Sequence, residues 1–170
     1  ESIRAAEPGI HEIIVVDDAG DPPEPISTIR NPARLGVAKS RHLGARSATG
    51  DVVLIMDAHM RVKPGDVRRV ARLAQVTGGF AYAGCNGHYA AALMVESGIL
   101  RCKWVPKPEL RTFRTTAFMG AFYAVARKTL EEMGGWIGLP GYWGMDEEAM
   151  SILALKHRIP ITADTAVQTH

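Results

Sequence analysis

The chain has 170 residues, enough for one domain with a hydrophobic core and too few for two large ones. Lys and Arg number 20 against 18 Asp and Glu, so the formal net charge is +2, an excess too small to indicate nucleic acid as a partner. No apolar run approaches the ~20 residues of a transmembrane helix, and no signal peptide opens the sequence. Cys85 and Cys102 lie far apart without metal-ligand spacing, and we interpret them as small core residues in a reducing compartment.

Both ends of the sequence look truncated. It begins with ESIRAAEPG, typical of the end of a helix followed by a loop, and it closes at His170 after a strand-like segment. We therefore expect residues 1–170 to form part of a single domain in the cytoplasm, with any membrane attachment made through a region outside this sequence.

Short apolar runs alternate with helical segments along the chain. The pattern predicts strands at residues 12–16, 52–56, 80–84, 121–126 and 161–167, and helices at residues 37–48, 66–76, 128–135 and 146–157. Gly50 and Asp66 are the expected C-cap and N-cap of the first two helices. The stretch 103–116, with prolines, charges and no clean period, is expected to be a long surface loop. Because the apolar runs show no strict alternation, we predict an α/β domain with a mostly parallel sheet covered on both faces.

Acidic residues follow two of the predicted strands. EIIVV ends at Asp17 and Asp18, and VVLIM ends at Asp57. In open α/β sheets, ligands bind beyond the carboxyl ends of the strands. A functional site is therefore expected where these acids emerge.

Asp57 and His59 have a spacing that suits a metal ion. Residues i and i+2 of an extended segment project to the same side, so the carboxylate and the imidazole can converge. A mixed oxygen and nitrogen donor set suits Mn2+ or a similar divalent cation better than Ca2+. The alternative is a strand-end turn with a capping aspartate and a surface histidine.

A second acidic group lies in YWGMDEEAM, residues 142–150, where Asp146, Glu147 and Glu148 begin a helix. One interpretation is a carboxylate general base at the mouth of a cleft, with Tyr142 and Trp143 as a platform on which a sugar or another ring stacks. The other interpretation is structural, because the helix dipole favours acids in a first helical turn.

Basic residues gather between residues 30 and 46, around Gly36. Arg34, Lys39, Arg41 and His42 flank the predicted start of a helix, where a diphosphate could bind. A solvated basic helix face is the simpler alternative.

Four segments, in this order, resemble the nucleotide-sugar-dependent glycosyltransferases of family two, whose GT-A fold is a Rossmann-like sheet flanked by helices. The segments are EIIVVDDAG, NPARLGVAKSRHLGARSATGDVVLIMDAH, GAFYAVARKTLEEMGGW and YWGMDEEAMSILAL. The resemblance covers nearly the whole chain and begins at the family's second strand, so the first strand is absent. It implies a metal-dependent transferase that moves a sugar from a nucleotide-sugar, with uridine as the commonest base, to a saccharide, peptide or lipid-linked acceptor.

The resemblance also implies roles for individual residues. Asp146 is expected to be the general base of an inverting reaction, and Mn2+ or Mg2+ is expected at Asp57 and His59, with His170 as a distant third ligand. The residues expected to contact the donor are Asp17, Asp18, Arg34, Lys39, Arg41, Asp57, Gly120 and Ala121, and those expected to bind the acceptor are Tyr142, Trp143, Glu147 and Glu148.

The sequence departs from the family pattern at three positions. His59 replaces the last acid of the usual D-x-D motif, which resembles the D-x-H motif of the polypeptide N-acetylgalactosaminyltransferases. Met145 replaces the first acid of the E-D pair, and His42 replaces an asparagine. Three alternatives stay open: a retaining peptide glycosyltransferase of the D-x-H type, a non-catalytic nucleotide- or carbohydrate-binding domain, and a nucleotidyltransferase. The loop 103–116 is expected to fold over donor and acceptor after metal binding.

Overall fold

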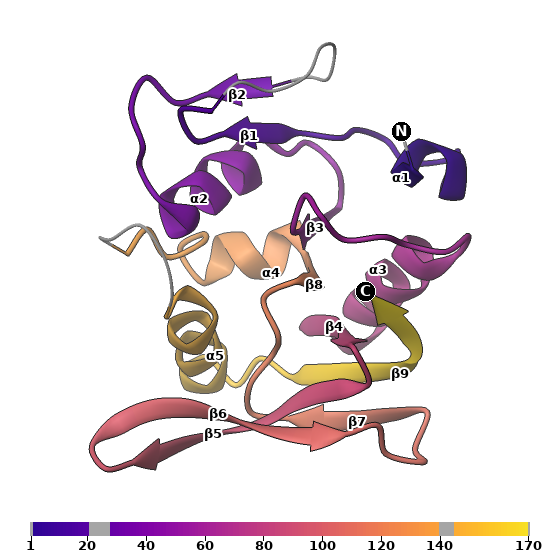
Figure 1. Ribbon diagram of the computed structural model, residues 1–170, viewed down its shortest axis with the longest axis vertical. Helices are drawn as coiled ribbons and strands as arrows, with labels where there is room; N and C mark the ends of the chain where they lie inside the picture. The colour runs from indigo at the N-terminus through magenta and orange to yellow at the C-terminus, as the bar shows by residue number, and fades with distance from the viewer. Residues whose placement is uncertain (1, 21–27, 140–144, 170) are drawn as a thin grey trace.

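The computed structural model describes residues 2–20, 28–139 and 145–169. Its elements in chain order are α1 (Ser2–Ala6), β1 (Val15–Asp17), β2 (Thr28–Arg30), α2 (Val37–Ser47), β3 (Val52–Met56), α3 (Asp66–Thr77), β4 (Phe80–Cys85), β5 (His88–Glu96), β6 (Ile99–Pro106), β7 (Thr112–Thr115), β8 (Phe122–Ala126), α4 (Arg127–Glu132), α5 (Asp146–Lys156) and β9 (Ile161–Thr169), as Figure 1 shows. Each predicted helix and strand has a counterpart, although the strand expected at 12–16 is only β1, Val15–Asp17, and β2, β5, β6 and β7 are additional. Within the described ranges no helix is long and apolar enough to cross a bilayer.

A seven-stranded sheet forms the centre of the molecule, and β1 and β2 form a separate two-stranded sheet. In the large sheet β8 lies between β3 and β4, and β4 also pairs with β5 and β9. Among the pairings that the structure describes, β1–β2 and β4–β9 are parallel and the other five are antiparallel. The expected α/β fold with flanking helices is therefore confirmed. The large sheet is mixed, and because β4–β9 is parallel while its other five described pairings are antiparallel, the mostly parallel pairing expected from the sequence is not observed.

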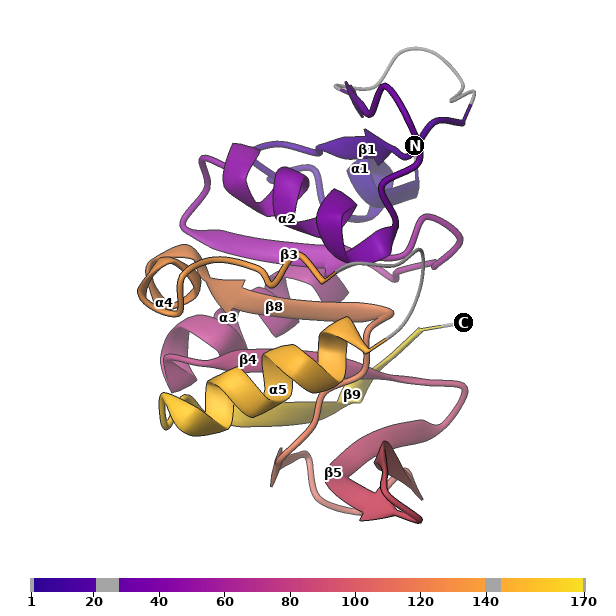
Figure 2. The same ribbon diagram turned by 90° about the vertical axis from the view of Figure 1, so that its left-hand side faces the viewer.

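The two faces of the large sheet carry side chains of different size. On β4, Phe80 and Tyr82 belong to one core cluster, whereas Ala81 and Ala83 belong to another. This is the alternation that a strand imposes. The aromatic face packs against α5 and the alanine face packs against α3, which the small side chains allow to approach closely. In Figure 2 these two helices lie on opposite sides of the strands.

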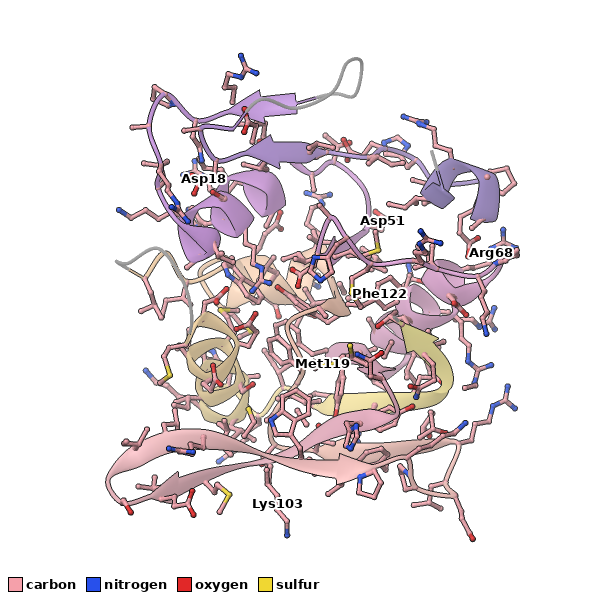
Figure 3. All side chains as sticks on the ribbon, in the orientation of Figure 1. Asp18, Asp51, Arg68, Lys103, Met119 and Phe122 are labelled. Carbon is pink, nitrogen blue, oxygen red and sulfur yellow. The ribbon has the colours of Figure 1, made fainter. Side chains whose placement is uncertain are left out.

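Most of the stretch 103–116 forms strands, in β6 as far as Pro106 and in β7, so the expectation of a long surface loop holds only for the connection at 107–111. β5 and β6 form a hairpin that turns at Ser97 and Gly98, with φ of 52° and 78°, and β7 pairs with β9. In β6 exposed and half-buried residues alternate from Ile99 to Lys103, but Lys103 and Trp104 are both exposed, opposite a register shift in β5, so the sequence from residue 103 shows no clean period. Figure 3 shows Lys103 of β6 pointing away from the body of the molecule. The expected closure of this stretch over donor and acceptor stays a prediction.

β3 is less buried than its apolar sequence predicts. Val53 is buried and the other four residues are half-buried. The reason is that β3 is the last strand on its side of the large sheet and, among the described strands, pairs with β8 alone. Two predicted caps also differ. Ala48 and not Gly50 is the C-cap of α2, and Gly65, with φ of 90°, is the N-cap of α3, so that Asp66 is the first helical residue.

Candidate active site

Four segments far apart in the sequence meet around the side chain of Arg41, on α2. Its guanidinium donates hydrogen bonds to Asp57 Oδ1 (3.1 Å), at the end of β3, and to Gly120 O (3.0 Å), just before β8. It also donates to Asp146 Oδ2 (2.8 Å) and to Glu147 Oε1, in the first turn of α5. One cation thus joins three carboxylates, and we call Arg41, Asp57, Asp146 and Glu147 the Arg41 cluster.

The backbone brings these groups together. Because β3 and β8 are antiparallel, the end of β3 lies beside the start of β8, and Asp57 N donates a hydrogen bond to Ala121 O at 3.0 Å. Gly120 lies so close to α5 that a Cβ atom there would overlap the Glu147 carboxylate. The absence of a side chain at Gly120 therefore leaves room for the Glu147 side chain.

Asp146 is the most buried carboxylate of the Arg41 cluster, with 1% of its side chain exposed. Its Oδ2 accepts a second hydrogen bond from Trp136 Nε1, at 3.3 Å. Met145 precedes it with a left-handed φ of 68° and turns the chain into α5. The helix N-terminus and the two donors together stabilise a negative charge that burial alone would destabilise.

Burial and neighbouring charges change the ionisation of the Arg41 cluster. Burial and the charge of Asp146 raise the pKa of Glu147, although Arg41 opposes this shift. Burial lowers the pKa of Arg41, but its anionic neighbours outweigh burial and raise the pKa, so the guanidinium stays protonated. The cluster therefore holds one fixed positive charge and a carboxyl, on Glu147, that releases its proton less readily than an exposed glutamate.

Asp18 lies at the end of β1, beside the start of α2, and is labelled in Figure 3. Its carboxylate accepts hydrogen bonds from the backbone N–H groups of Leu35 (2.7 Å) and Gly36 (2.8 Å) and from Asn31 Nδ2 (2.9 Å). Burial raises the pKa of Asp18, but these hydrogen bonds outweigh burial and lower it. Asp18 therefore holds the turn from which α2 begins, and α2 carries Arg41.

The other residues predicted for the donor lie outside the Arg41 cluster. Asp17 is buried and accepts a hydrogen bond from Arg30 Nε at 3.0 Å. Arg34 and Lys39 are exposed, and Ala121 is half-buried. Arg41, which was predicted to approach a nucleotide, instead directs its guanidinium at carboxylates.

Asp57 and His59, the residues predicted to hold a cation, lie in a turn in which Met60 N donates a hydrogen bond to Asp57 O at 3.0 Å. The extended segment from which their convergence was expected is therefore not observed. The Asp57 side chain is 35% exposed, and His59 is exposed directly after the same strand. Asp57 already faces one cation, the guanidinium of Arg41, so the carboxylate is placed to bind positive charge. Carboxylate oxygens and imidazole nitrogens are ligand types that suit Mn2+, so a cation at Asp57 and His59 stays a prediction. His170 lies outside the described residues, among which no group of three His, Cys, Asp or Glu could hold a metal ion.

On the predicted acceptor side, Tyr142 and Trp143 lie outside the described residues. Glu148 is half-buried and accepts a weak hydrogen bond from Cys102 Sγ at 3.6 Å, so it faces β6. Burial and this carboxylate raise the pKa of the Cys102 thiol to about 12. Cys85 and Cys102 form no disulfide, and both are half-buried against the main core cluster rather than within it.

Two aromatic residues of the site were not predicted. Tyr123 and Trp136 stack with ring centroids 5.3 Å apart, and the guanidinium carbon of Arg41 lies 5.9 Å from the Tyr123 centroid. His42 Nδ1 lies 2.5 Å from the backbone carbonyl oxygen of Trp136 and helps to fix the backbone there. The sequence gives little sign of this role. Trp136 follows a glycine pair, as residues at turns often do, but aromatic residues in or near a strand usually indicate only a hydrophobic core.

The chain belongs to glycosyl transferase family 2, whose family model matches residues 1–92. Polypeptide N-acetylgalactosaminyltransferase 15 of Homo sapiens is 38% identical over 69 residues, which cover 33% of this chain and 11% of that protein. N-acetylgalactosaminyltransferase 7 of Drosophila melanogaster is 27% identical over 183 aligned residues, which cover 84% of this chain and 30% of that protein. The chain thus spans less than a third of the length of these relatives.

Two solved structures show the same fold. GalNAc-T7 with UDP, GalNAc and Mn2+ matches with a TM-score of 0.74 at 17% identity, over 93% of this chain and 36% of that chain. The mannosyltransferase PcManGT from Pyrobaculum calidifontis, in complex with GDP-Man and Mn2+, matches with a TM-score of 0.62 at 21% identity, over 93% and 46% of the two chains. The expected GT-A fold is therefore confirmed.

Proposed function

We propose that residues 1–170 belong to one catalytic domain of a metal-dependent glycosyltransferase, which moves a sugar from a nucleotide-sugar to an acceptor hydroxyl. The observation that carries this proposal is the Arg41 cluster, in which the strand-end Asp57, two residues before an exposed histidine, shares Arg41 with two carboxylates of α5. Family membership supports the same class of enzyme. Complexes of the two similar structures with UDP or GDP-Man, each with Mn2+, support a nucleotide-sugar donor and a divalent cation.

Asp57 and His59 would hold the cation in a D-x-H arrangement, with His170 as the third ligand. When bound, the cation offsets negative charge that develops on the departing nucleoside diphosphate. Asp57 accepts the hydrogen bond from Arg41 on Oδ1, so Oδ2 is the oxygen that it offers to the cation. Lys39, exposed on α2, is a side chain that could contact the diphosphate. UDP-sugars and Mn2+ are the first donor and cation to test, with Mg2+ as the second cation.

Asp146 remains the predicted general base. Its Oδ2 receives hydrogen bonds from Arg41 and Trp136, so the acceptor proton would transfer to Oδ1. Glu147 is the competing proton acceptor, because its side chain is 19% exposed, against 1% for Asp146, and its pKa is raised. In either case the acceptor oxygen would attack the anomeric carbon from the face opposite the leaving diphosphate, with inversion.

A second candidate is retaining transfer to a peptide Ser or Thr. The Asp57–His59 motif and the similarity to N-acetylgalactosaminyltransferases favour it. The inverting candidate is compatible with a saccharide acceptor and with a lipid-linked acceptor. The anomeric configuration of the freshly formed product, measured by NMR, separates inversion from retention.

The test is transfer or hydrolysis of a panel of UDP-sugars by the complete protein in the presence of Mn2+. We expect turnover that Asp57→Asn abolishes. We also expect Asp146→Asn to lower the rate more than Glu147→Gln, and the reverse order would make Glu147 the base. If nucleotide binds and no sugar is transferred or hydrolysed, the proposal is wrong and the domain is a non-catalytic nucleotide-binding module.

A further inference from the structure

Arg41 is the group through which both halves of the site are connected. Its two terminal nitrogens contact acceptors on three elements: Asp57 after β3, Gly120 before β8, and the first turn of α5. Nη2 donates hydrogen bonds to Asp57 and Gly120, while Nη1 donates to Asp146 and Glu147. A planar guanidinium can make such contacts in two directions at once, whereas an ammonium group is a point charge. Arg41 is therefore a physical bridge between the predicted cation ligand and the predicted proton acceptors.

The positive charge in the Arg41 cluster is too small to balance its three carboxylates. One guanidinium, with 11% of its side chain exposed, faces three carboxylates. With all of them ionised, the excess is two negative charges, and charges in a partly buried site are poorly screened by water. A further cation at Asp57 would reduce this excess, and it would compete with Arg41 for the same carboxylate.

The interior side of the cluster contains an unpaired polar atom. Tyr123 is fully buried beneath the Arg41 guanidinium, and its Oη makes no hydrogen bond to the residues that the structure describes. Buried polar groups almost always have a partner. The orphan hydroxyl therefore indicates that the hydrogen bonding of the cluster is incomplete in the arrangement seen here.

We propose that Arg41 is a positioning residue that couples cation binding at Asp57 to the placement of Asp146 and Glu147. A cation that takes the carboxylate of Asp57 weakens its bond to Arg41 and leaves the guanidinium to the two acids of α5. The coupling is reciprocal, so a change at the α5 end alters the affinity of Asp57 for the cation. This inference rests on the proposed function for the assignment of Asp57 as a cation ligand.

Trp136 provides a reporter of this coupling, because its indole N–H donates to Asp146. We would record the indole N–H resonances of the 3 tryptophans and assign that of Trp136 with Trp136→Phe. Asp57→Asn should shift the Trp136 resonance, although the structure shows no hydrogen bond between these two side chains. The matched control is Asp51→Asn, because Asp51 is an exposed aspartate just before β3, labelled in Figure 3, whereas Asp57 follows the same strand. The control should leave the resonance unchanged.

Arg41→Lys then tests whether the bridge is Arg41 itself. In this background Asp57→Asn should no longer shift the Trp136 resonance, and a Mg2+ titration that shifts it in the wild type should shift it less than half as far. If Asp57→Asn leaves the wild-type resonance in place, or shifts it equally with Lys at position 41, the coupling does not exist. The wild-type comparison decides this even if Arg41→Lys fails to fold. Mg2+ could leave every resonance unchanged while Asp57→Asn still shifts the Trp136 resonance only when Arg41 is present. In that case Arg41 connects the two sides of the cluster, and the assignment of Asp57 as a cation ligand is wrong.

Discussion

The guanidinium of Arg41 and the carboxylate of Asp146 lie 2.8 Å apart, although 105 residues separate them in the chain. Their side chains are 11% and 1% exposed, so this is a largely buried ion pair that holds the start of α5 against α2. Removing one partner of such a pair leaves an uncompensated charge and typically costs about 3–5 kcal/mol. Substitutions of the residues around this ion pair, and not of the pair itself, are therefore the more informative tests of the site.

Trp136→Phe removes the indole N–H that donates to Asp146 while keeping an aromatic ring in the core. The loss of a hydrogen bond to a buried carboxylate should lower the free energy of unfolding by about 1–3 kcal/mol. Urea denaturation measures the change. Trp104→Phe is the control, because Trp104 is 51% exposed on β6 and its replacement should change stability by less than about 0.5 kcal/mol. Equal effects of the two substitutions would contradict the role given to Trp136.

Gly120→Ala should displace the Glu147 carboxylate, because the new Cβ would overlap it. We expect a loss of about 1–3 kcal/mol in the free energy of unfolding, as for other overpacked sites. Glu147→Ala in the same chain should recover part of this loss, because it removes the overlapping atoms. Gly138→Ala is the matched control, since a Cβ there meets nothing within 4 Å. A double variant no more stable than Gly120→Ala would show that the overlap is not with Glu147.

Asp18→Asn tests the turn before α2 through its pH dependence. The folded pKa of Asp18 lies below its ordinary value of 3.8, so the ionised carboxylate stabilises the fold. That contribution is present above pH 3.8 and is lost as the pH falls through the lower, folded pKa. Asp18→Asn should therefore be less stable than the wild type near pH 7, with the difference shrinking in acid below about pH 4. Urea denaturation across pH measures this, and exposed Asp51 provides the control substitution. A difference independent of pH would contradict the prediction.

His59→Ala should weaken cation binding without weakening the fold, because His59 is exposed and follows β3 instead of packing within it. We expect a change of less than about 0.5 kcal/mol in the free energy of unfolding without metal. Mn2+ affinity should fall at least about tenfold, since even groups around a metal ligand contribute that much. His157→Ala, at another exposed histidine, should change neither quantity. A loss of stability without metal, with Mn2+ affinity intact, would assign His59 to the fold.

Much of the fold was predictable because hydrophobic periodicity marks buried elements. The run 52–56 and the helix from residue 146 were predicted at almost their observed bounds. The direction of β8 was not predictable, because a strand buried on both faces reads alike in either orientation. The β5–β6 hairpin was missed because many of its side chains, such as Val95 at 71% exposure, pack against no core and impose no period.

The site was predictable only in part. The acids at the ends of β1 and β3 follow from the general rule for ligand sites in α/β sheets. The role of Arg41 does not follow from the sequence, because a helix with several basic residues gives no sign of which one points inward. Its position depends on carboxylates that α5 and β3 supply, and on the absence of a side chain at Gly120.

The most direct test of the proposed function is a binding titration of UDP, with and without Mn2+, on the wild type and on Asp57→Asn. The proposal predicts binding that requires Mn2+ and that Asp57→Asn abolishes. UDP binding that is independent of Mn2+, or that survives in Asp57→Asn, would contradict the assignment of Asp57 as the cation ligand of a nucleotide-sugar site.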